Sequence, residues 1–78
     1  MDFLLEEEMI DILTFCLQNP DSDQVESEKQ RLKEIGNALF SDGGVDAMEN
    51  FFFVVENRII GEIKKDPKPF RNLWNGIS

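Results

Sequence analysis

Three carboxylates near the beginning of the sequence, Glu7, Glu8 and Asp11, are the residues best suited to chemistry. Glu7 and Asp11 are four residues apart, so on a helix they share one face, and carboxylate oxygens of this kind can hold Mg²⁺. A small carboxylate–metal hydrolase would need a second acidic motif, and the acids between positions 26 and 34 do not repeat the spacing. We therefore expect a solvated acidic patch and assign no catalytic, cofactor-binding or metal-binding residue, with the hydrolase as an alternative.

The single cysteine, Cys16, is a second candidate for chemistry. The sequence contains no histidine to activate a thiol as a nucleophile, and one cysteine can form neither an internal disulfide nor a zinc site of the usual kind. Helical spacing places Cys16 on an apolar face with Met9 and Leu13, which predicts a core residue. An unpaired cysteine favours a reducing compartment, and we expect the cytoplasm.

The net charge of the chain limits the classes of molecule that it is expected to bind. The 78 residues carry 16 acids and eight bases, a net charge of -8, which disfavours nucleic acid because its phosphates are bound by Lys and Arg. Residues 1–28 hold acids and no base, which is not typical of a secretory signal. These acids form either solvated helix faces or a patch that attracts a basic protein. The longest apolar run, 51–55, is too short to cross a bilayer, so we expect no membrane contact.

Apolar spacing predicts two helices in the first half of a single domain that spans residues 1–78. The first covers about residues 3–18, with Asp2 as its N-cap and Pro20 after its end. The second covers about residues 23–41, where Asp23 and Glu26 resemble a capping box. Gly43 and Gly44 follow it and predict a turn; they lack the pattern of a phosphate-binding loop.

A third helix is predicted over about residues 45–65, because the apolar spacing continues on both sides of 51–55. A strand over 51–55 is the alternative, since its residues favour strands. The prolines after this helix predict a break and then a short C-terminal helix over about residues 67–75, with Asp66 as its cap. Its apolar residues fall at i, i+3, i+4 and i+7: Phe70, Leu73, Trp74 and Ile77. The fold class predicted is therefore all-α, a bundle of three main helices closed by a short fourth one.

Residues 32–55 resemble one tetratricopeptide repeat, a helix–turn–helix unit. The resemblance rests on residues 36–40, Gly43 and residues 51–52, whereas Met48 and Val55 stand where the repeat has alanine. Stacked repeats need about three copies, and this chain has one, so the resemblance implies a similar hairpin rather than a repeat protein. Gly43, Gly44 and Met48, with residues 74–77, also resemble a group of small uncharacterised bacterial helical proteins, which implies no activity.

Four apolar residues are candidates for an interface: Phe53, Ile60, Phe70 and Trp74. Phe53 and Ile60 project from a different side of the third helix than its main apolar stripe, so either other parts of the chain or a second subunit covers them. Trp74 with Phe70 would either anchor a partner or close the core. We expect a non-catalytic protein–protein interaction module that forms a homodimer. The first alternative is an acidic adaptor or inhibitor that occupies a basic site on another protein.

Overall fold

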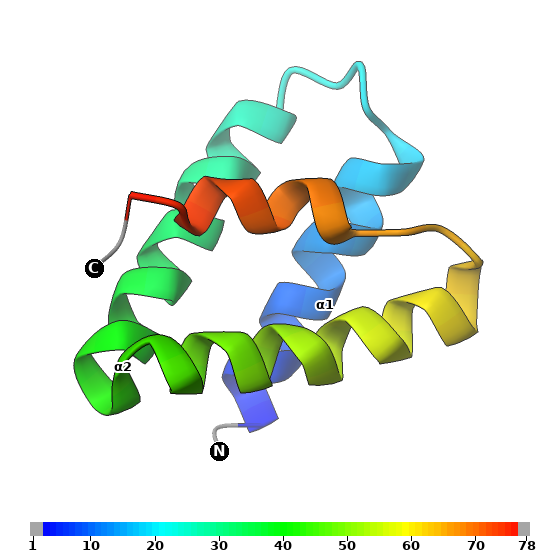
Figure 1. The fold of residues 1–78 in the computed structure, drawn as a ribbon. Coiled ribbons are helices and arrows are strands. Elements are labelled where there is room, and N and C mark those ends of the chain that lie inside the picture. Colours follow the sequence, from blue (N-terminus) through cyan, green and yellow to red (C-terminus); the bar gives the residue numbers. More distant parts are fainter. Residues whose placement is uncertain (1–2, 77–78) are drawn as a thin grey trace.

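A computed structural model describes residues 3–76 as helices joined by short connections (Figure 1). The elements are α1 (Phe3–Gln18), α2 (Val25–Ile63) and a 3-10 helix, η1 (Lys68–Trp74). Residues 3–76 contain no strand, which confirms the all-α class and helix at residues 51–55. The cap predicted at Asp2 and the position of Ile77 lie outside the described residues.

The first helix begins and ends where the sequence predicts. Its buried side chains recur at helical spacing, and Met9, Leu13 and Cys16 are almost fully enclosed. Asn19 closes the last turn, because both its backbone N–H and its side-chain amide donate to the Phe15 carbonyl, at 2.8 and 3.2 Å. Pro20 then prevents continuation. This end turns the chain back so that α2 can pack against α1.

The second and third predicted helices form one element, α2, which bends sharply at Gly44. Gly44 has φ 75° and ψ -162°, a backbone region that is essentially restricted to glycine. Gly43 is also required, because a Cβ there would lie 2.7 Å from the Cβ of Ala47. The chain therefore changes direction sharply at the glycine pair, and the two halves of α2 diverge from it (Figure 1).

Both ends of α2 differ slightly from the prediction. The capping box of Asp23 and Glu26 is wrong: the N-cap is Gln24, which makes no side-chain capping bond, and its backbone N–H donates instead to the Ser22 hydroxyl at 3.2 Å. At the other end, Lys64 adopts a left-handed conformation and its N–H donates to the Ile60 carbonyl at 3.1 Å. The helix therefore ends at Ile63 rather than at residue 65.

The C-terminal segment is a 3-10 helix and not the short α-helix predicted for residues 67–75. Pro69 has no N–H to donate to a carbonyl four residues earlier, and Lys68, which precedes it, is disfavoured in the α region. The tighter turn is closed instead by Phe70 N–H donating to the Pro67 carbonyl at 2.9 Å. Asp66 accepts from the Lys68 N–H at 2.9 Å, but the N-cap of η1 is Pro67 and not Asp66 as predicted.

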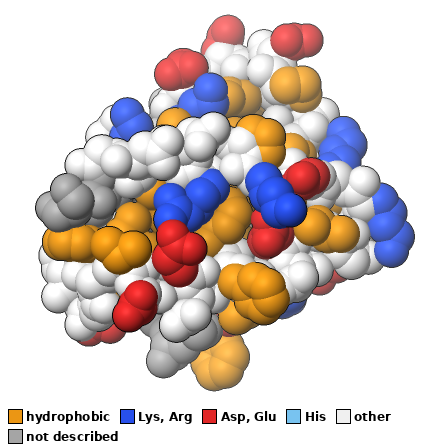
Figure 2. All heavy atoms as spheres, in the orientation of Figure 1, with side chains coloured by type: hydrophobic (Ala, Val, Ile, Leu, Met, Phe, Trp, Pro, Cys, Tyr) orange, Lys and Arg blue, Asp and Glu red, His pale blue; other side chains and the backbone are white. Residues whose placement is uncertain are grey.

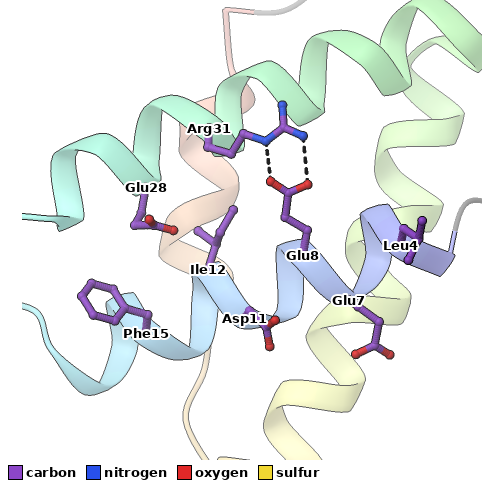
Figure 3. A pocket seen from close by; sticks show the side chains of 8 residues that line it. All are labelled: Leu4, Glu7, Glu8, Asp11, Ile12, Phe15, Glu28 and Arg31. Carbon is purple, nitrogen blue, oxygen red and sulfur yellow. Dashed lines mark hydrogen bonds and ion pairs between the residues drawn. The ribbon is translucent and has the colours of Figure 1, made fainter.

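The two halves of α2 enclose the core together with α1 and η1. α1 lies against one side of the diverging halves, and η1 crosses the other (Figures 1 and 3). Arg58 in the second half of α2 reaches Glu6 near the start of α1, and Lys65, which follows α2, donates from Nζ to the Leu17 carbonyl near the end of α1. No helix within residues 3–76 combines the length and apolar character needed to cross a membrane. The core consists of Met9, Ile10, Ile12, Leu13, Cys16, Val25, Leu32, Ile35, Met48, Phe51, Phe52, Val55, Ile59 and Trp74.

Candidate functional site

The predicted acidic patch is largely neutralised by arginines of α2. Glu8 accepts two hydrogen bonds from Arg31, at 2.5 Å to Nε and 2.9 Å to Nη2, and Arg31 also contacts Glu34 at 3.2 Å (Figure 3). The hydrogen bonds from Arg31 lower the pKa of Glu8, and those to Glu8 and Glu34 raise the pKa of Arg31. Glu8 therefore joins α1 to the first half of α2.

A second arginine joins α1 to the other half of α2. Arg58 Nη1 lies 3.2 Å from Glu7 and 3.4 Å from Glu6, and its Nη2 lies 3.7 Å from Glu62. Hydrogen bonding to Glu7 raises the pKa of Arg58. Glu6 is only 6% exposed, and this contact was not predicted from the sequence. The available signal was its position seven residues before Leu13, which places it on the core-facing side of α1.

Asp11, the third member of the patch, lines an open groove between α1 and the first half of α2 (Figure 3). The groove has a volume of about 550 Å³. Across it lies Glu28 of α2, and neither carboxylate has an ion-pair partner among residues 3–76. Over the same residues no three Asp, Glu, Cys or His side chains are grouped so that they could hold a metal ion.

Cys16 occupies the core, as its position on the apolar face predicts. Its side chain is buried, and burial is the main cause that raises the pKa of the thiol, followed by the negative charge of Glu28. The thiolate is the reactive form, so a raised pKa and an enclosed sulfur both oppose nucleophilic chemistry. Cys16 therefore packs as a small hydrophobic residue.

Trp74 also belongs to the core, so it is not available to a partner. It is 2% exposed, its indole Nε1 donates to the Leu32 carbonyl at 2.9 Å, and its ring meets Phe52 edge-on at 5.5 Å between centroids. Arg71 lies over the ring, 5.7 Å from its centroid. Phe70 is half-buried against the same core. Of the four interface candidates, only two are therefore well exposed.

Phe53 and Ile60 lie on the outside of α2, where they are 63% and 39% exposed. Phe53 borders a groove of about 340 Å³ between α2 and η1, whose rim also carries Glu56 of α2 and Lys68 of η1. Neither of these two charges has an ion-pair partner among residues 3–76. We call Phe53, Ile60, Glu56 and Lys68, with the groove that Phe53, Glu56 and Lys68 border, the Phe53 face.

Charges of both signs alternate around the groove of the Phe53 face. Figure 2 shows Lys and Arg side chains next to Asp and Glu side chains across η1 and the second half of α2, with apolar side chains between them. Arg71 and Glu49, which also line the groove, pair with each other. The face therefore combines an exposed aromatic ring, an adjacent hollow and balanced charge.

No protein-family model, curated protein or solved structure matches this chain. The resemblance of residues 32–55 to a tetratricopeptide repeat therefore stays a prediction.

Proposed function

We propose that this protein is a non-catalytic interaction module that acts as a homodimer through the Phe53 face. One observation carries the proposal: Phe53, a large aromatic side chain, is 63% exposed beside a groove of about 340 Å³. Aromatic residues that insert into a partner's pocket supply much of the binding energy of protein interfaces. In a two-fold dimer, the Phe53 ring of each subunit can enter the groove of the other, so the same contact forms twice.

The charges of the face support self-association rather than binding to a strongly charged partner. In a two-fold interface each contact occurs twice, so a surface must complement itself. Glu56 and Lys68 satisfy this condition, because Glu56 of one subunit can meet Lys68 of the other while Phe53 enters the groove. A surface of one sign would repel its own copy.

The small size of the chain provides a physical reason for self-association, because a dimer buries more surface than one chain can. A domain of this length buries a limited fraction of its surface, and small domains often rely on disulfides, metals or a second subunit. The only cysteine is free and buried, and residues 3–76 present no metal cluster. A reduced Cys16 also favours the cytoplasm as the place where the dimer acts.

Replacement of Phe53 tests the proposal directly. Phe53→Ser removes the ring from the face, and Phe3→Ser is the matched control because Phe3 is 77% exposed on α1 and does not line the groove of the Phe53 face. Light scattering after size exclusion should show a dimer for the wild type and for Phe3→Ser, and a monomer for Phe53→Ser with unchanged helicity. A Phe53→Ser variant that remains dimeric would refute the proposal.

A further inference from the structure

The groove between α1 and the first half of α2 has an apolar floor. Ile12 and Phe15 contribute to the core and also line the groove, and Leu4, which is 82% exposed, extends its apolar lining toward the start of α1. Glu28 extends from α2 above Ile12 and Phe15, and Asp11 lies on their other side (Figure 3). The groove is thus an apolar strip between two carboxylates.

Within the described chain, the unpaired charges of this groove are all negative, whereas the Phe53 face carries unpaired charges of both signs. Its single cation, Arg31, is held by Glu8 and Glu34, which leaves the negative charges of Asp11 and Glu28 without a counterpart among residues 3–76. A ligand that buries the apolar strip must also bring positive charge to both edges, because an unpaired carboxylate is costly to desolvate.

We propose that this groove docks an amphipathic helix of another protein that carries Lys or Arg beside an apolar stripe. Grooves between splayed helices bind amphipathic helices through apolar residues at helical spacing. Here the apolar stripe would lie on Phe15 and Leu4, above the buried Ile12, and the cations beside it would reach Asp11 and Glu28. The aliphatic stems of Lys and Arg suit such a strip, because they cover apolar surface while their charged ends stay at the edge.

A second copy of this chain is a poor occupant for the groove, because most of its own cations are already engaged. Four of them form ion pairs with acids of the same chain, and two donate to backbone carbonyls. These residues are Lys29, Arg31, Arg58, Arg71, Lys64 and Lys65. A different protein is therefore the better source of the charge that the groove lacks, and the net charge of -8 attracts such a partner over a longer range.

A peptide titration tests the proposal with the full chain. The probe is a fluorescein-labelled peptide of about four helical turns, with Leu on one face and Lys on the other. One control peptide scrambles the same residues so that no apolar stripe forms, and another replaces each Lys by Glu. Fluorescence anisotropy should show saturable binding of the first peptide alone. Equal binding of the scrambled peptide would overturn the proposal, because it would show attraction by charge without the groove.

Matched variants of the protein then locate the site. Asp11→Asn with Glu28→Gln should weaken binding of the basic peptide about tenfold, since each lost pair costs up to about 1 kcal/mol. Asp42→Asn with Asp46→Asn changes the net charge equally at exposed positions near the bend and should leave affinity within about twofold. Equal weakening by both pairs would refute the site. So would a fall in the mass of the dimer caused by the Asp11 and Glu28 changes alone, because the groove would then hold a second copy.

Discussion

Two arginines of α2 make the ion pairs that join it to the acidic first helix. Arg31 binds Glu8 and Arg58 binds Glu7 and Glu6, so each half of α2 is attached to α1 by an arginine–carboxylate contact. The Arg31–Glu8 pair is bidentate, the geometry in which arginine is most specific. Sequence alone located the acids but not these partners, because a pairing between residues 51 positions apart depends on how the helices pack.

The Glu8–Arg31 pair predicts a dependence of stability on pH. Because the folded state lowers the pKa of Glu8 below its ordinary 4.5, the pair stabilises the fold above that value, and the contribution is lost as the pH falls through the lowered pKa. Urea unfolding should find Glu8→Gln less stable than wild type at neutral pH, by at most about 1 kcal/mol because the pair is partly exposed. The difference should vanish in strong acid.

A control variant separates this pair from a general effect of lost charge. Glu26 contacts Lys29 only at 3.8 Å and its side chain is 88% exposed, so Glu26→Gln should change stability little at any pH. A Glu8→Gln variant that behaved like Glu26→Gln across the titration would contradict the role given to Arg31.

Trp74 anchors η1 to the core by packing against Phe52 and by donating a hydrogen bond to the Leu32 carbonyl. Trp74→Phe keeps an aromatic ring but removes the hydrogen bond to the Leu32 carbonyl and leaves a small void, and it should cost about 1–3 kcal/mol of unfolding free energy. Urea unfolding followed by far-ultraviolet circular dichroism measures this loss. Phe3→Ser, at an exposed position, should change stability by less than about 0.5 kcal/mol. An equal effect of the two changes would mean that Trp74 is not fixed as described.

At the scale of elements, the bend at Gly44 decides whether residues 25–63 form one straight helix or two halves that enclose a core. Gly44→Ala forces a side chain into a backbone region that costs about 1–3 kcal/mol, and it should destabilise the fold by that amount. Gly61→Ala is the matched control, because Gly61 is inside the helix with open space around it and should become slightly more stable. Thermal unfolding of both variants measures the contrast; a neutral Gly44→Ala would contradict a required bend.

The sequence predicted these elements well where one local signal dominates. Regular apolar spacing and Pro20 defined α1, and the glycine pair located the bend. The prediction was wrong at the start of α2, where Ser22 rather than Asp23 satisfies a backbone N–H. It was also wrong about η1, because an apolar i, i+3, i+4 pattern fits both helix types and the two prolines decide between them.

At the scale of the whole molecule, the candidate site could be predicted only in part. Phe53 and Ile60 lie outside the main apolar stripe of their helix, which indicated that three helices could not easily cover them. Both side chains are exposed in the described chain. Trp74 could not be assigned, because core and interface use the same residue type until η1 is placed. The groove beside Phe53 was not predictable either, since it forms between segments brought together by the fold.

Reversal of single charges tests whether the Phe53 face pairs with itself. Glu56→Lys and Lys68→Glu each place like charges opposite one another twice in a two-fold dimer, so each should weaken association about tenfold or more. The double variant restores opposite charges and should recover most of the affinity. Sedimentation equilibrium measures the dissociation constants. Absence of recovery in the double variant would contradict the proposed contact between Glu56 and Lys68.

The molar mass of the wild-type chain in solution, followed over a wide range of concentrations, tests the central claim most directly. Self-association through the Phe53 face predicts a mass that rises from the 9.0 kDa of one chain toward twice that value and no further, because a two-fold contact closes on itself. A mass that stays at 9.0 kDa at the highest concentration, or that keeps rising beyond a dimer, would contradict the account.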